Sequence, residues 1–164
     1  MLRPLLFGLV AASAVLGSAE ASAAPPAGPT LIKAISAAQL QALPASMGHA
    51  LVAQADGTTG DVKARSGDGQ EYSLRGALCD DGGATNCRVI VVQAWIDHAP
   101  VPVEKLNAVN LNIAAVSTVY DPDQGMLRVV RLIILDGGIS SANLRENVTA
   151  MLNSVPAVLK AIEE

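Results

Sequence analysis

The stretch Val89–Ile96 reads VIVVQAWI and decides the fold. Alternate residues of a strand point to opposite faces of the sheet, and in this run both sets are mainly apolar. A strand of this kind is buried on two sides, which is typical of the middle of a sheet. We therefore expect Val89–Ile96 to be a central strand with partners on both edges.

Three weaker strand patterns precede it. Ala50–Gln54 ends at the turn residues 56–60, and residues 62–65 then alternate apolar and charged side chains. Tyr72, Leu74 and Leu78 alternate with polar residues, which predicts a third half-buried strand.

A short helix is expected before these strands. Ser36 and Gln39 have the spacing of a capping box, and Gly48 suits the left-handed position that ends a helix. Pro44 falls inside this helix and is expected to kink it.

Beyond the central run, the spacing of apolar residues predicts a helix over residues 103–113. Strands 116–120 and 126–135 then form a hairpin, and an amphipathic helix over 141–161 follows. The expected order is α-β-β-β-β-α-β-β-α. This is an α+β fold, an antiparallel sheet with helices packed on it.

The N-terminus has the pattern of a secretory signal peptide. Arg3 precedes a short apolar stretch, and Ala21-Ser22-Ala23 matches the A-x-A cleavage pattern. We expect cleavage after Ala23, so that residues 1–23 are signal peptide, 24–35 a Pro/Ala-rich linker and 36–164 one domain. The mature chain is expected to be periplasmic or secreted, without membrane insertion, because the apolar stretch is too short to span a bilayer.

Cys79 and Cys87 are the two cysteines of the chain. In an exported domain such a pair predicts a disulfide, here closing a hairpin connection that contains two glycines. A redox-active pair usually has two intervening residues, and a metal site would need further ligands nearby. Both alternatives are therefore disfavoured.

Composition argues against nucleic acid as a partner. The net charge is −4, whereas phosphate binding needs clustered Lys and Arg. After cleavage the aromatic residues are Tyr72, Trp95 and Tyr120, too few for a platform on which bases stack.

Hydrolytic chemistry is the least favoured function. His49 and His98 are the candidate bases, and Asp97 adjoins His98, but no serine lies in a nucleophile elbow. The candidate nucleophiles are Ser73, Ser117, Ser140 and Ser141.

Three short patterns are interpreted structurally. Residues 121–125 resemble the start of a calcium loop, but Leu132 occupies the position of the required glutamate, which favours a tight hairpin. Asn107 and Asn110 share a helical face and are expected to bond neighbouring backbone. Gly137–Gly138 is expected to let the chain turn into a helix capped by Ser140 or Ser141, with anion binding there as the weaker alternative.

These patterns together resemble the YbjN family, bacterial proteins described as sensory transduction regulators. Two departures are that Val109 stands where the family has Trp, and that one extra residue precedes Gly125. The positions that carry the resemblance are Cys79, Cys87, Asn107, Asn110, Tyr120, Asp121, Asp123, Gly125, Gly137 and Gly138.

The resemblance implies a fold similar to type III secretion chaperones and a non-enzymatic, regulatory function in binding another protein. It implies no catalytic residue, no cofactor and no metal. Surplus apolar surface would mark the interface, and a homodimer is the simplest way to cover it. The alternative is a periplasmic carrier of an apolar small molecule or lipid, with a pocket between sheet and helices.

Overall fold

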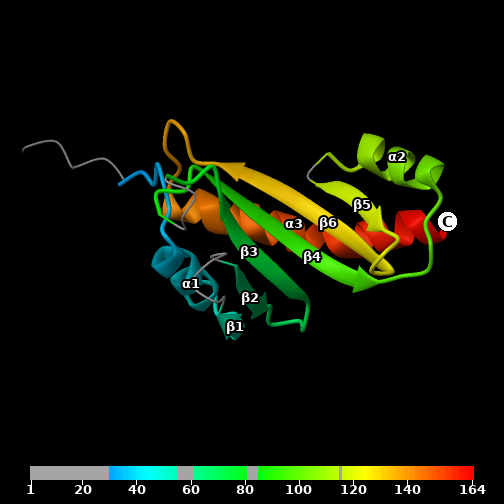
Figure 1. Ribbon diagram of the computed structural model, residues 1–164, viewed down its shortest axis with the longest axis horizontal. Helices are drawn as coiled ribbons and strands as arrows, with labels where there is room; N and C mark the ends of the chain where they lie inside the picture. The colour runs from blue at the N-terminus through cyan, green and yellow to red at the C-terminus, as the bar shows by residue number, and fades with distance from the viewer. Residues whose placement is uncertain (1–29, 55–60, 81–84, 115) are drawn as a thin grey trace, which may run out of the picture.

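The central position of the strand β4 (Val89–Asp97) organises the structure, a computed structural model that describes residues 30–54, 61–80, 85–114 and 116–164. The strands form one antiparallel sheet in the order β1-β2-β3-β4-β6-β5 (Figure 1). β4 pairs along its whole length with β6 and on its other side with β3. The prediction that Val89–Ile96 is central is confirmed.

The element order is also the predicted one. The other strands are β1 (Ala50–Gln54), β2 (Val62–Arg65), β3 (Glu71–Ala77), β5 (Ser117–Asp121) and β6 (Met126–Ile134). The helices are α1 (Ala37–Ser46), α2 (Val103–Asn112) and α3 (Ser141–Glu163). The predicted bounds differ from these by one or two residues at element ends.

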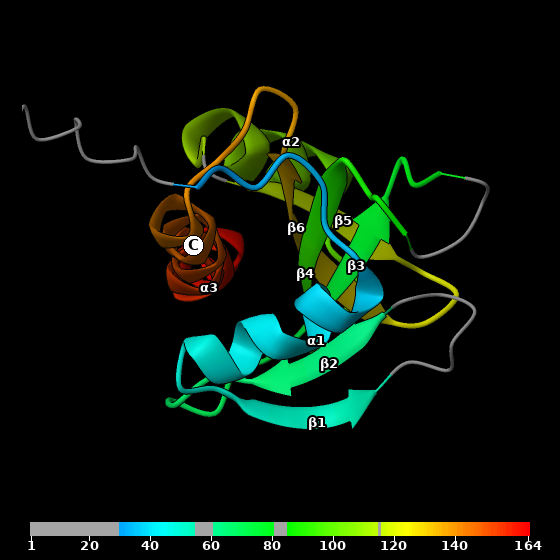
Figure 2. The ribbon, with the colours of Figure 1, turned by 90° about the vertical axis from the view of Figure 1, so that its left-hand side faces the viewer.

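All three helices lie on one side of the sheet (Figure 2, in which α3 is seen nearly end-on). α3 packs on β4 and β6, α1 packs on β1, β2 and β3, and α2 packs on β5 and α3. Between the layers lies a core of fully buried side chains from both, including Ile90, Val92, Leu127, Val148 and Val155. These side chains pack in the layer in which a lipid carrier would hold its cargo.

Local signals position the helices as expected. Ser36 and Gln39 form the capping box of α1, and Gly48 follows that helix at φ 74°. α1 continues through Pro44, and α3 continues through Pro156.

Part of the predicted linker belongs to the folded domain. Ile32 exchanges backbone hydrogen bonds with Ile139, and Ile35 does so with Cys87, at 2.8–3.0 Å. Ile35 is buried. Ile32 and Ile35 of the predicted linker therefore pair with the domain, because two isolated bridges fix a segment that has no periodicity of its own. Residues 1–29, with the predicted signal peptide and cleavage site, lie outside the described residues.

Leu78 is a second correction. Alternation with Tyr72 and Leu74 predicted that it would be half-buried, but its exposed fraction is 64%. β3 ends at Ala77, and Leu78 has φ 51°, so the alternation of the strand no longer applies where the chain turns toward Cys79.

Candidate functional site

Asn110 joins α2 to β5 by hydrogen bonds to the strand backbone, as the sequence predicted. Its Oδ1 accepts hydrogen bonds from the backbone N and the Oγ1 of Thr118 at 2.6 and 2.9 Å, and its Nδ2 donates to the Thr118 carbonyl at 3.1 Å. Thr118 is buried, so these bonds satisfy polar groups that water cannot reach. Asn107, the other residue of this motif, is exposed on the same helix.

The motif Tyr120–Gly125 forms the hairpin between β5 and β6. Asp121 Oδ1 accepts the backbone N–H groups of Asp123 and Gln124 at 3.2 and 3.3 Å, and Gly125 has φ 65°. Tyr120 packs against the core. Asp121 therefore stabilises the turn by a bond to its own loop. Within the described part of the chain, no group of three or more His, Cys, Asp or Glu side chains could hold a metal ion.

The two glycines before α3 are needed for backbone reasons. Gly137 and Gly138 have φ 84° and 95°, and a Cβ on Gly138 would lie 2.8 Å from the Leu31 Cβ. Ser140 is the helix N-cap and accepts the Asn143 N–H at 3.1 Å. The predicted turn into a capped helix is present.

The structure joins Cys79 and Cys87 by a disulfide, the pairing that the spacing predicted. The buried Cys87 also exchanges backbone bonds with Ile35 and packs on Gly76, whose missing side chain leaves room for both sulfur atoms. The bridge thus ties β3, the connection to β4 and the N-terminal segment together.

The candidate hydrolytic residues are not assembled into a triad. His98 Nδ1 is 2.7 Å from the carbonyl oxygen of its neighbour Ala99. His49 Nδ1 lies 2.8 Å from the hydroxyl of Tyr72. The four serines are dispersed: Ser73 lies on β3, Ser117 on β5, and Ser140 and Ser141 at the start of α3.

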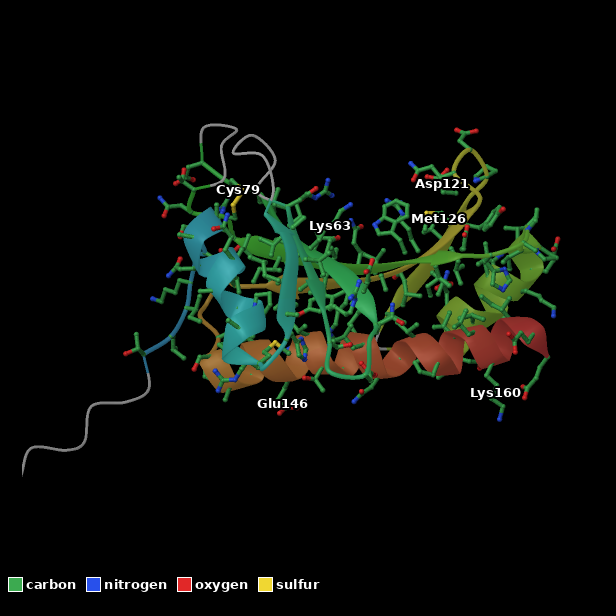
Figure 3. All side chains as sticks on the ribbon, turned by 90° about the horizontal axis from the view of Figure 1, so that it is seen from below. Lys63, Cys79, Asp121, Met126, Glu146 and Lys160 are labelled. Carbon is green, nitrogen blue, oxygen red and sulfur yellow. A yellow bond between two sulfur atoms is a disulfide. The ribbon has the colours of Figure 1, made fainter. Side chains whose placement is uncertain are left out.

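The face of the sheet opposite the helices carries exposed apolar side chains. No local sequence pattern accounts for them. Cross-strand pairing places Val89 beside Ile134 and Val91 beside Leu132 on this face, and we name these four residues the open-face stripe. Leu132 and Ile134 are 62% and 66% exposed. No described helix packs on this side. Figure 3 shows α3 beneath the sheet, with Glu146 and Lys160 pointing away from it and Lys63, Asp121 and Met126 on the far side.

A hollow of about 460 Å³ adjoins the stripe on the same face, and we name it the Trp95 hollow. Its lining includes Val52, Ser73, Gln93, Trp95 and Met126. Ser73 and Gln93 are cross-strand neighbours, and they are only 6% and 8% exposed. The described residues provide neither side chain with a hydrogen-bond partner, so their polar groups are available to whatever fills the hollow.

Arg128 lies beside the hollow, directly across from Trp95 in the β4–β6 pairing. Its guanidinium carbon is 4.8 Å from the centre of the Trp95 ring, a cation–π contact. Its Nε is buried without a hydrogen-bond partner in the described structure. Arg131, on the opposite side of β6, differs because it donates to Asn147 of α3 at 2.7 and 3.0 Å.

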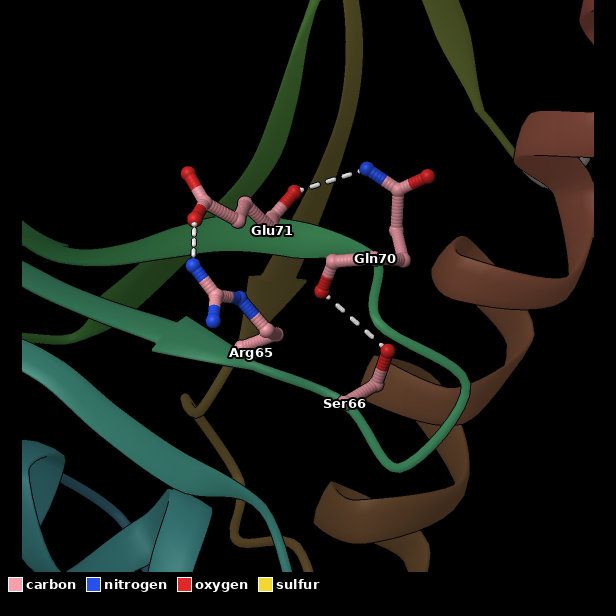
Figure 4. A network of polar contacts seen from close by, with 4 residues as sticks. All are labelled: Arg65, Ser66, Gln70 and Glu71. Carbon is pink, nitrogen blue, oxygen red and sulfur yellow. Dashed lines mark hydrogen bonds and ion pairs between the residues drawn. The ribbon is translucent and has the colours of Figure 1, made fainter.

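The acidic groups of the hollow each have a basic partner. Glu71 pairs with Arg65, in a network with Ser66 and Gln70 at the β2–β3 turn (Figure 4). Asp61 lies 4.0 Å from Arg75. Lys63 also lines the hollow and, like Arg128, forms no ion pair within the described ranges. Lys63 and Arg128 are therefore two cations at or beside the hollow that no described acid pairs with.

Sequence reasoning missed Ser73, Gln93, Trp95 and Arg128 as a group. Gln93 was the one sequence indication of a polar site here, because it is the one polar residue in VIVVQAWI. The pairing of Trp95 with Arg128 gave none, because the two belong to strands more than 30 residues apart whose register only the structure fixes.

Comparison with known proteins shows the fold. No family model matches the chain, and no curated protein matches it. A chain of the solved structure titled "Structure of the HopA1-SchA Chaperone-Effector Complex" matches with a TM-score of 0.51 and 16% identity, over 76% of this chain and 91% of that one. The α+β fold is thus similar to that of a type III secretion chaperone, as predicted. No helix in the described ranges has the length and apolar content to span a bilayer.

Proposed function

We propose that this chain is an exported, non-enzymatic regulatory domain of the YbjN type that binds another protein through the open face of its sheet. The observation that carries the proposal is the open-face stripe, in which Leu132 and Ile134 are largely exposed. An antiparallel sheet with one face in water normally alternates apolar and polar residues, but here Leu and Ile occupy exposed positions of that face, beside Val89 and the buried Val91.

The energetic argument follows from these side chains. Covering one Leu or Ile side chain stabilises a complex by about 1.5–3 kcal/mol. Exposed apolar patches of this kind mark protein interfaces. The matched structure is a chaperone–effector complex, which supports a protein as the partner for this fold.

Export is part of the proposal. It is supported by the N-terminal pattern Arg3 to Ala23 and by a disulfide that an oxidising compartment would preserve. Intact-mass measurement of protein from the envelope fraction tests it. We expect a chain that begins at Ala24 with both thiols oxidised, and recovery of the uncut chain from the cytosol would refute export.

The partner is tested by crosslinking in cells. A photoreactive amino acid replaces Leu132, and the control position is Glu146, on the far side of α3 (Figure 3). We expect a discrete adduct from position 132 that is absent from 146 and is lost on adding Ile134→Asp. Folding of each variant is checked by its thermal unfolding.

A homodimer is the second candidate, because the same stripe could meet its own copy across a two-fold axis. Light scattering on the purified chain distinguishes a homodimer from a chain that binds a different protein. A dimer that Ile134→Asp converts to monomer, with self-adducts alone at position 132, would replace the proposed partner with a second copy. Identical adducts from positions 132 and 146 would refute the open face as an interface.

A further inference from the structure

The Trp95 hollow has the size and chemistry of a binding site. Its volume of about 460 Å³ lies within the range of ligand pockets, roughly 300–1,000 Å³. Trp95, Met126 and Val52 supply apolar walls, and the buried side chains of Ser73 and Gln93 line it without partners. These two polar side chains can bond water or a ligand that enters the hollow.

Arg128 adds a specific charge preference. Stacking on Trp95 restricts its guanidinium, whose Nε is buried. A restricted guanidinium is suited to a carboxylate, which it can bind by two parallel hydrogen bonds.

The acids that line the hollow are already paired with bases. Glu71 and Asp61 are paired with Arg65 and Arg75, which leaves Lys63 as a second cation at the hollow. Two further acids, Asp97 and Asp121, lie across from Met126 at the hairpin end, where Asp121 bonds its own loop.

We propose that the Trp95 hollow binds an extended segment of the partner protein in which an acidic side chain stands two residues from a large apolar one. Side chains two positions apart in an extended chain share a face, about 7 Å from each other. The same spacing separates Gln93 from Trp95 along β4. The apolar side chain fills the hollow against Trp95 and Met126, and the carboxylate meets Arg128.

This inference names the chemistry of the partner, and it rests on the proposed function. The proposed function and this inference can be tested separately, because Arg128 and Trp95 are not part of the open-face stripe. If Arg128→Gln leaves the crosslinked adduct intact while Ile134→Asp removes it, protein binding stands and the acidic segment is wrong.

The direct test uses synthetic peptides with the mature, oxidised chain. One seven-residue peptide has glutamate at its third position, phenylalanine at its fifth and serine elsewhere. A second peptide replaces the glutamate by glutamine, and a third replaces the phenylalanine by alanine. Binding is followed by the fluorescence of Trp95, the single tryptophan of the chain, and by calorimetry.

We expect the glutamate–phenylalanine peptide to bind about tenfold or more tightly than either substituted peptide. Arg128→Gln should remove the preference for glutamate over glutamine. Lys160→Gln is the matched control, because it changes the charge equally on the far side of α3 (Figure 3), and it should leave the preference unchanged.

Three results would overturn the inference. The first is an equal preference for glutamate in Arg128→Gln and in the unmodified chain. The second is binding of 3-phenylpropanoate alone as tightly as the peptide, which would make the hollow a site for small carboxylates. The third is a dimer that excludes all the peptides, which would assign this face to a second copy.

Discussion

Gly76→Ala tests the packing of the disulfide against β3. A Cβ at this position would lie 2.5 Å from the Cys87 Sγ, 2.9 Å from the Cys87 Cβ and 3.4 Å from the Cys79 Sγ. Real Cβ atoms essentially never have such a neighbour within 3.0 Å, so both Cys87 contacts are too close. Either β3 or the bridge must move.

The expected cost follows from that overlap. Forcing an extra carbon into a packed site destabilises by about 1–3 kcal/mol, and the gain of Ala over Gly in a strand offsets roughly 0.5–1 kcal/mol of it. The matched control is Gly67→Ala in the β2–β3 turn, where a Cβ would meet nothing within 4 Å. That variant should be neutral or slightly more stable.

Urea unfolding followed by circular dichroism measures both variants. The same substitution is then made in a Cys79→Ala, Cys87→Ala background, where the closest atom is absent and only the Cβ contact at 2.9 Å remains. We expect Gly76→Ala to cost at least about 0.5 kcal/mol less there. Equal stability of the Gly76→Ala and Gly67→Ala proteins would refute the close approach.

Three further outcomes are expected. Asn110→Ala removes three hydrogen bonds to buried groups of β5, and it should lower the free energy of unfolding by about 1–3 kcal/mol. The control is Asn107→Ala on the exposed side of the same helix. In the same urea assay it should change the free energy of unfolding by less than about 0.5 kcal/mol. Burial raises the pKa of Tyr72 to about 12, so the stability it contributes is complete below about pH 10, where the unfolded tyrosine is still neutral, and decreases as the pH rises toward 12. Tyr72→Phe should flatten that decline in urea titrations at successive pH values, and an unchanged slope would contradict it. Gly138→Ala adds a contact at 2.8 Å to a positive φ and should lower the melting temperature more than Gly137→Ala, which has the positive φ alone; equal losses would refute the steric reason.

The element order was predictable because it depends on local patterns. VIVVQAWI specifies a strand that needs partners on both edges, and the capping box at Ser36 fixes the start of α1 without reference to the rest of the chain. Leu78 was mispredicted because the alternation of a strand continues only as far as the strand does. The pairing of Ile32 with Ile139 joins residues more than 100 positions apart, and no periodicity in either segment predicts it.

The candidate site was harder to predict for a related reason. Apolar residues on both sides of β4 predict that both faces are shielded from solvent, but they do not indicate what covers each face. The three helices all pack on one side, so the other apolar side remains open in the described structure. The hollow needs β2, β3, β4 and the β5–β6 hairpin in register, and that register is a tertiary property.

The residues that carry the YbjN resemblance and the residues of the open face have different physical tasks. Asn110, Asp121 and Gly138 each satisfy backbone groups or permit a backbone angle, so their replacement changes the free energy of unfolding. Leu132 and Arg128 lie on the surface side of the sheet, where loss of the side chain leaves the core intact. Their replacement should therefore change affinity and leave stability nearly unchanged. The residues of the resemblance thus stabilise the scaffold, while the proposed partner contacts side chains that the scaffold does not require.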